Sequence, residues 1–250
     1  MLAVLTRSLF SQPTITGVGR YDLVAPGGLS GLTWATSDQY YAILDSGGIM
    51  YPVTINIDSA TGAITSASLG STIVLSPGSD LEGIAFNPEG DSGAGSVFVS
   101  DEVGPAVREH SLGGSLNNTL LVPNVYRTAR LNKSLESLTR QDNGSTIWTS
   151  NEEALANDGS ESMFLAGTVV RLQRFVRSES GYIANGQLLV LERQVTGSGI
   201  CFNLPEFRNK IYWVDFTGAT DVSAISALDG ASYPKVSKTY QVCGLCVPTL

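Results

Sequence analysis

DLEGIAF at residues 80–86, followed by SVFVSDEVG at 96–104, is the stretch that decides the fold class. Both segments alternate apolar with polar or small residues, which is the period of a half-buried β-strand. The residues between them are rich in Asp, Asn and Gly, which favour turns. The pair therefore predicts two antiparallel strands. Because helical periodicity is hard to find elsewhere in the chain, we expect an all-β protein.

The same unit recurs along the chain. GLSGLTW at 28–34 and SLESLTR at 134–140 align with DLEGIAF, which places Ser30, Glu82 and Glu136 in register at spacings of 52 and 54 residues. A second strand-like run follows each of them, and a later segment resembles a further copy. These runs are YYAILDSGG at 40–48, SVFVSDEVG at 96–104, STIWTSNEEA at 145–154 and LLVLERQ at 188–194. Further strand-like runs complete four strands per unit, so we predict a β-propeller of four-stranded antiparallel blades.

Composition excludes several classes of function. The chain has 250 residues and a net charge of −8, which disfavours a nucleic-acid backbone as a partner. It holds no run of 18 apolar residues, so no membrane-spanning helix is expected. The single histidine, His110, excludes a zinc site built from several histidines and leaves a serine hydrolase only one candidate base. Carboxylates must therefore carry most of the polar chemistry.

Acidic side chains are expected to gather at one end of the propeller. The first strand of each blade lines the central channel, so Glu82 and Glu136 should meet there. Other polar residues end the second strands beside the same mouth: Asp45, Asp101, Glu102, Asn151, Glu152 and Glu192. Oxygen ligands from several blades suit a hard cation, which predicts a Ca²⁺ site. The alternative is that these side chains hydrogen-bond backbone N–H groups and hold the blades in register.

These segments resemble the phytase-like family, which is described by the esterase-like activity of phytase. The resemblance runs through GLSGLTW, DLEGIAF with VFVSDEVGPAVREHSL, SLESLT with IWTSNEEAL, and LLVLERQ with KIYWVDFTGATDVSA, and it covers roughly residues 14–240. It implies an extracellular or periplasmic β-propeller that hydrolyses small phosphate or other esters. The start, MLAVLTRSLFSQP, is no clear signal peptide.

The resemblance also implies roles for individual residues. The metal ligands it implies are Glu82, Asp101, Glu136 and Glu152, and the catalytic residues are Glu102, Glu192 and Arg193. Apart from the resemblance, we predict that Arg108 and Asp45 bind substrate, since a guanidinium matches two phosphate oxygens and Asp45 ends a strand beside the channel mouth. For each arginine, a salt bridge to one of the surplus acids is the alternative. Strand alternation puts Arg108 and His110 on one face of AVREHSL and Glu109 on the other, and we expect His110 at the surface.

The sequence departs from the family pattern in two places. Ser30 stands where the next two units have Glu, and the chain stops at QVCGLCVPTL where the pattern would continue into another blade. We therefore expect a truncated propeller of about four to six blades. Residues 1–13 are predicted to be a residual export signal or a disordered segment, residues 14–242 a single propeller domain, and residues 243–250 an atypical tail.

A non-catalytic function stays open beside the hydrolase. Propellers are widely used as binding scaffolds, so the alternative is a module whose face binds a protein or a glycan. Trp34, Trp148 and Trp213 fall within predicted strands, where packing between blades accounts for them.

Overall fold

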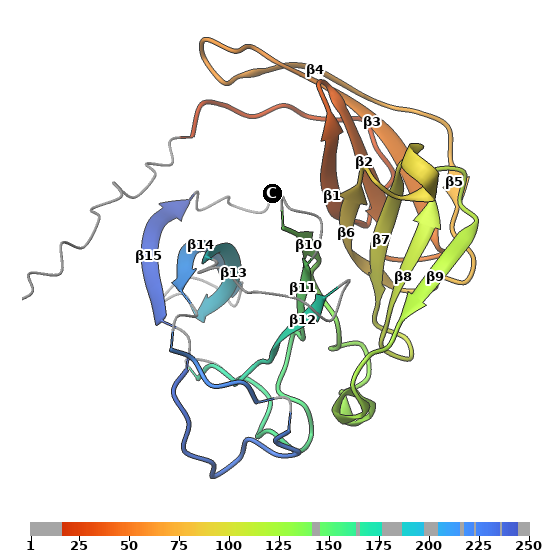
Figure 1. The fold of residues 1–250 in the computed structure, drawn as a ribbon. Helices are drawn as coiled ribbons and strands as arrows, with labels where there is room; N and C mark the ends of the chain where they lie inside the picture. The colour runs from red at the N-terminus through yellow and green to blue at the C-terminus, as the bar shows by residue number, and fades with distance from the viewer. Residues whose placement is uncertain are drawn as a thin grey trace, which may run out of the picture. The chain divides into compact units, whose positions relative to one another are not determined.

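The protein is an assembly of antiparallel β-sheets with almost no helix (Figure 1). The structure is a computed structural model that describes residues 17–141, 146–163, 166–176, 187–197, 205–215, 218–222, 224–235 and 237–244. Within these residues the only helical elements are two short 3₁₀ turns, Asp91–Gly93 and Asn124–Thr128. The prediction of an all-β antiparallel protein is confirmed.

Two four-stranded paths form the first and second sheets. The first sheet has the order β1 (Leu29–Thr36), β2 (Gln39–Leu44), β3 (Ile49–Ile57) and β4 (Ile64–Leu69), and β5 (Ile73–Val74) also pairs with β3. The second sheet has the order β6 (Leu81–Asn87), β7 (Ser96–Asp101), β8 (Ala106–Ser111) and β9 (Leu116–Leu120). From β1 to β4 and from β6 to β9, each strand pairs with the next along the chain, as short connections between antiparallel strands favour.

The third and fourth sheets are three-stranded where the structure describes them. The third is β10 (Thr139–Arg140), β11 (Thr146–Ser150) and β12 (Leu172–Val176), and the fourth is β13 (Gln187–Gly197), β14 (Pro205–Asp215) and β15 (Ser237–Gly244). The chain divides into two compact units. The larger holds the first three sheets and residues 219–234, and the smaller holds the fourth sheet. The predicted boundaries at residues 14, 242 and 243 remain predictions.

Two apolar clusters hold the larger unit together. One joins the first sheet to the second and contains Ile43, Met50, Leu75, Leu81, Ile84, Val97 and Val99. The other joins the second sheet to the segment and strands that follow, and contains Phe98, Val107, Tyr126, Leu135, Ile147 and Leu155. The second sheet is therefore covered on both faces, which explains why every residue of β7 is buried.

The tryptophans differ in their surroundings. Trp148 is buried in β11, as packing between sheets predicts, whereas Trp34 on β1 is 59% exposed. The side chain of Trp213 lies outside the described part of the structure.

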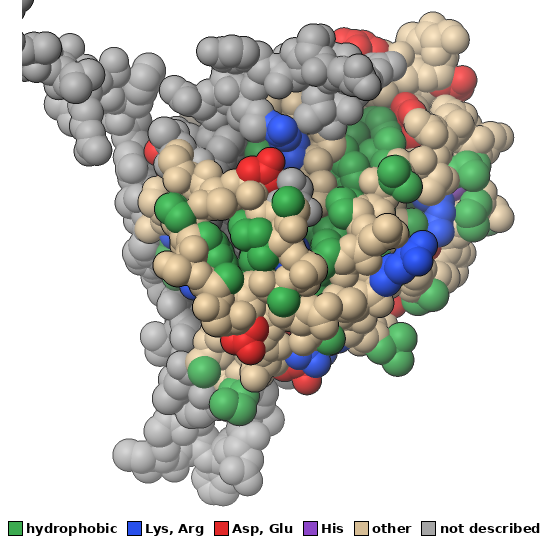
Figure 2. All heavy atoms as spheres, turned by 60° about the horizontal axis from the view of Figure 1, so that its bottom comes forward, with side chains coloured by type: hydrophobic (Ala, Val, Ile, Leu, Met, Phe, Trp, Pro, Cys, Tyr) green, Lys and Arg blue, Asp and Glu red, His purple; other side chains and the backbone are tan. Residues whose placement is uncertain are grey.

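No helix among the described residues is long and apolar enough to cross a membrane. On the face shown in Figure 2, lysine and arginine side chains are few and lie scattered among acidic and apolar ones.

His110 is buried, which corrects the expectation of a surface histidine. Its Nδ1 lies 3.2 Å from the carbonyl oxygen of Gly114, and its Nε2 has no hydrogen-bond partner. The β8–β9 turn places Gly114 directly against the carbonyl oxygen of Val74 in β5. This end of β8 is therefore covered by a neighbouring sheet, a contact that strand alternation alone does not reveal.

The burial of His110 predicts acid sensitivity. Burial lowers its pKa below the ordinary value of 6.5, and the nearby charge of Arg108 lowers it further. The unfolded chain therefore takes up this proton at a higher pH than the native protein, so stability falls as pH drops below about 6.5. Between pH 7 and pH 5, we expect the unfolding midpoint of the wild type to fall more than that of His110→Gln. Parallel midpoint curves would show that His110 does not titrate during acid unfolding.

Candidate functional site

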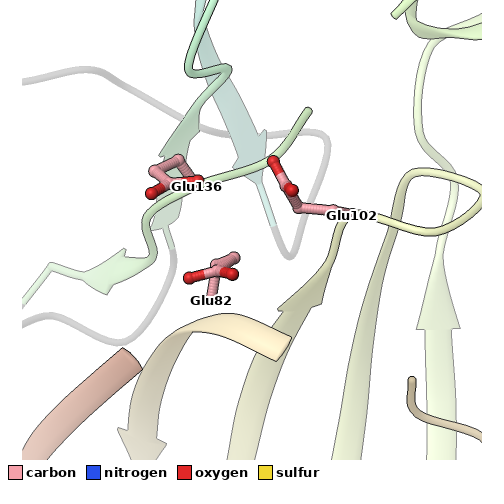
Figure 3. A group of neighbouring side chains, drawn as sticks. All are labelled: Glu82, Glu102 and Glu136. Carbon is pink, nitrogen blue, oxygen red and sulfur yellow. The ribbon is translucent and has the colours of Figure 1, made fainter. Parts of the chain in front are cut away.

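Three glutamates converge at one end of the strands of the larger unit (Figure 3). One carboxylate oxygen from each of Glu82, Glu102 and Glu136 lies within 4.8 Å of the others. Glu82 is the second residue of β6, Glu102 follows the end of β7, and Glu136 precedes β10. We call these three residues the carboxylate cluster. It joins two predicted metal ligands, Glu82 and Glu136, with Glu102, for which a catalytic role was predicted.

A β-bulge turns Glu82 towards the other two glutamates. The pairing of β6 with β7 is regular from Ile84 to Asn87 but shifts in register between Leu81 and Ile84. The N–H of Gly83 therefore donates to the side-chain oxygen of Ser100, at 2.8 Å, in place of a ladder partner. Bulges bend a strand and re-aim its side chains, so this irregularity sets the direction of Glu82.

Backbone hydrogen bonds fix the segments that carry the cluster. The N–H of Glu102 donates to the carbonyl of Asp80 at 2.9 Å, and the N–H of Glu136 donates to the carbonyl of Ser150 at 2.9 Å. The N–H of Ser134 donates to the Glu102 carboxylate at 2.6 Å, which links the second sheet to the segment before β10. The cluster thus belongs to the sheet framework and not to a long loop.

The cluster is electrostatically strained in the absence of a cation. Burial raises the pKa of Glu82 to about 8, and the charges of Glu136, Glu102, Asp80 and Asp45 contribute further. Burial is also the main cause that raises the pKa of Glu102, partly opposed by the hydrogen bond from Ser134. A cation among these carboxylates would relieve both the burial of charge and the mutual repulsion.

The donor set fits a hard divalent cation. Ca²⁺ binds carboxylate oxygens at roughly 2.3–2.6 Å, so oxygens on opposite sides of one ion lie about 5 Å apart. The three cluster oxygens, all within 4.8 Å of one another, can therefore reach one ion together. Water or substrate oxygens would complete the six to eight ligands that Ca²⁺ prefers.

Asp101 and Arg108 lie apart from this donor set, as partners of each other. Nη1 of Arg108 is 2.7 Å from Oδ2 of Asp101, and the Asp101 side chain is almost fully buried. The structure thus gives the predicted metal ligand Asp101 an arginine partner. It gives Arg108, predicted to bind substrate, the salt bridge that was its alternative.

Two further predicted residues, Asp45 and Glu152, lie near the cluster. Asp45 follows β2, and its charge contributes to the raised pKa of Glu82. Glu152 is exposed, and its N–H donates to the carbonyl of Ser134 at 2.9 Å. Ser30 donates to the carbonyl of Leu81 at 2.5 Å, a contact between sheets.

The side chains of two predicted catalytic residues, Glu192 and Arg193 on β13, are outside the described part of the structure, as are residues 1–13 and 245–250.

Sequence reasoning missed the residues that shape the cluster. Gly83 and Ser100 form the bulge contact, and Ser134 binds Glu102 through its backbone. Asp80 adds to the acidic surroundings, and burial raises its pKa, with the charges of Asp101 and Asp45 contributing. The usable signal was the Asp-Leu-Glu-Gly sequence itself, because glycine within a strand often marks a bulge or a close backbone approach.

The chain matches the model of a known protein family. A family model named phytase-like and described as "esterase-like activity of phytase" matches residues 25–184. This stretch contains β1 to β12 and all three residues of the carboxylate cluster. A search of curated proteins finds no match to the chain.

Proposed function

The chain belongs to the phytase-like family, and from this premise we propose that it is a hydrolase of phosphoric or carboxylic esters that works with Ca²⁺ held by the carboxylate cluster. The observation that carries the proposal is the approach of Glu82, Glu102 and Glu136 to within 4.8 Å. Three acids brought together from β6, the turn after β7 and the segment before β10 form an arrangement that costs stability unless a cation or protons occupy it.

The proposed chemistry follows from the charge of the site. A bound Ca²⁺ would polarise an ester or phosphoryl oxygen and lower the pKa of a bound water. The glutamates would hold the cation. Backbone hydrogen bonds of Glu102 and Glu136 fix the segments that carry them, and the N–H of Ser134 holds the carboxylate of Glu102. Asp45, Asp80 and Glu152 add negative charge nearby, so an anionic phosphate ester would be repelled by the cation-free site.

The proposal includes a propeller architecture. The first and second sheets each have four strands in chain order, and the third brings its first strand beside the same cluster, as consecutive blades would. The count of four to six blades and the closure of the ring are part of this proposal. An extracellular or periplasmic location is a further part, supported by the family's usual location.

Turnover assays test the proposed function. We expect purified protein to release phosphate from phytate or a chromophore from aryl phosphates or aryl esters in millimolar Ca²⁺, and to lose this activity in EDTA. Glu82→Gln with Glu136→Gln should lower kcat/KM by about 100-fold or more, as removal of groups that act on transition-state charge does. No turnover of any of these substrates by folded wild-type protein, or full turnover by the double variant, would contradict the proposal.

Glu109→Gln is a suitable control for these assays. Glu109 is also a partly buried carboxylate of the second sheet, where Asn87 and Ser96 donate to it at 3.0 and 2.6 Å. Asn87 lies five residues after Glu82 on β6, roughly 17 Å along a strand. The control therefore removes a carboxylate charge at the other end of the sheet, and turnover should be unchanged.

A binding scaffold is the second candidate, and one observation favours it. Leu32 and Trp34 on β1 are 56% and 59% exposed. Leu32 also lines a shallow cavity of about 270 Å³, whose lining is mainly apolar and includes Leu29, Ala42 and Val53. Exposed apolar patches of this kind mark interaction surfaces. Absence of turnover, together with protein or glycan binding that is lost in Trp34→Ser, would favour this candidate.

A further inference from the structure

We propose that Asp101 is a positioning residue for the carboxylate cluster, held in place by Arg108, and that it is not itself a ligand of the cation. This inference rests on the proposed function, because it assigns Asp101 a role at the proposed cation site. It also departs from the metal-binding role that the family resemblance implied for Asp101.

The carboxylate of Asp101 is surrounded by donors from the protein. Its Oδ2 accepts from Nη1 of Arg108 at 2.7 Å and from the N–H of Ser79 at 3.3 Å. Its Oδ1 accepts from the N–H of Val103 at 3.1 Å, from Oγ of Ser79 at 3.3 Å and from the N–H of Asp80 at 3.4 Å. Only 1% of the residue is exposed. Both oxygens are therefore engaged, and the charge already has a cationic partner.

These donors belong to the two segments that carry Glu82 and Glu102. Ser79 and Asp80 immediately precede β6, where Glu82 is the second residue, and Val103 immediately follows Glu102. Asp101 thus ties the start of β6 to the turn after β7. The nearby hydrogen bond from Glu102 N–H to the carbonyl of Asp80 closes the same junction. The carboxylate fixes the backbone from which two of the three cluster glutamates project.

Arg108 makes this arrangement stable. It projects from β8, opposite Val99 of β7, and is itself mostly buried. Without the guanidinium, the buried charge of Asp101 would lack a counter-ion, and loss of one partner from a buried pair is strongly destabilising. A positioning role therefore requires both residues, whereas a ligand role requires only Asp101.

Arg108→Gln separates the two roles. If Asp101 were a ligand, removing its competing cation would leave Ca²⁺ affinity unchanged or raise it. If Asp101 positions the cluster, we expect Arg108→Gln and Asp101→Asn each to weaken Ca²⁺ binding by about 10- to 100-fold, as loss of outer-shell partners does. Arg108→Lys keeps the charge and should restore part of the affinity. Calorimetric titration with Ca²⁺ measures these values, and circular dichroism shows which variants are folded.

Amide exchange gives a readout that does not depend on cation binding. The N–H of Ser134 donates to Glu102, so its exchange by NMR should accelerate at least 10-fold in Asp101→Asn and in Arg108→Gln if Glu102 loses its position. The amide of Gly70, which donates to the carbonyl of Pro52 in the first sheet, reports general destabilisation. Glu109→Gln should leave both amides and Ca²⁺ affinity unchanged.

The outcomes separate this inference from the proposed function. If wild-type protein binds no Ca²⁺ but Ser134 exchange accelerates in both variants, the cation site fails and the positioning role stands. Unchanged Ser134 exchange, equal acceleration at Gly70, or unchanged or tighter Ca²⁺ binding by Arg108→Gln would overturn the positioning role.

Discussion

Replacing Glu82 and Glu136 together by glutamine is expected to abolish the stabilisation that Ca²⁺ gives the native protein. A ligand that binds only the native state at 100 times its dissociation constant stabilises it by about 2.7 kcal/mol. For a chain of this length, that corresponds to a rise of roughly 5–11 °C in the unfolding midpoint. The double variant keeps the size and shape of both side chains but leaves Glu102 as the only carboxyl group of the carboxylate cluster. Thermal unfolding with Ca²⁺ and with EDTA measures the effect.

The same variant should have the opposite effect when no cation is present. Glu82 has a pKa of about 8 in the native protein and about 4.5 ordinarily, so the native state keeps a proton that the unfolded chain has lost. Cation-free stability therefore falls as pH rises from about 4.5 to about 8. Glutamine removes this cost, and at pH 8 in EDTA the double variant should unfold at or above the wild-type midpoint. A variant that is destabilised equally with and without Ca²⁺ would show that the glutamates are structural and bind no cation.

Glu109→Gln again serves as the matched control. It should keep the full Ca²⁺-dependent shift, because its partners Asn87 and Ser96 lie at the other end of the second sheet. If Mg²⁺ at the same concentration gave an equal shift, the site would have no preference for the larger ion. We expect the smaller shift with Mg²⁺, because Mg²⁺ requires oxygens at about 2.0–2.1 Å in near-octahedral geometry.

The sequence predicted the parts of this site that depend on repetition. Strand alternation located β6 and β7, and alignment of the repeats placed Glu82 and Glu136 in equivalent positions, which the structure brings together. The sequence could not show which of Asp101 and Glu102 faces the carboxylate cluster. Neighbouring residues at a strand end point in different directions, and which one faces the cluster depends on the register shift at Glu82 and on Arg108 of another strand.

Contacts between sheets account for what the sequence did not predict. His110 was expected at the surface because alternation describes one strand and not what covers it, and the turn at Gly114 meets Val74 of the first sheet. Trp34 was expected to pack between blades but is exposed, since an apolar strand face is buried only where another layer lies over it. The local sequence pattern thus locates the strands, but it does not show which sheets pack against one another.

Gly83→Ala is the backbone change expected to damage fold and site together. A Cβ at Gly83 would overlap Leu138 N and lie 2.5 Å from Ser137 C and 2.7 Å from Leu138 Cβ. The first two are backbone atoms that cannot rotate away, so β6 and the segment between Glu136 and β10 must separate. Overpacking costs about 1–3 kcal/mol and occasionally more, and we expect the upper end of this range. The unfolding midpoint should fall by roughly 6–12 °C.

This separation should also weaken Ca²⁺ binding, because Gly83 follows Glu82 and Ser137 follows Glu136. Displacing these neighbours draws the two carboxylates apart, and we expect the dissociation constant for Ca²⁺ to rise at least about 10-fold. Gly167→Ala is the control, since a Cβ there meets nothing within 4 Å, and its midpoint and affinity should match the wild type. Wild-type stability of Gly83→Ala would show that β6 and residues 137–138 are not in contact. Reduced stability with unchanged Ca²⁺ affinity would show that this contact supports the fold without setting the spacing of Glu82 and Glu136.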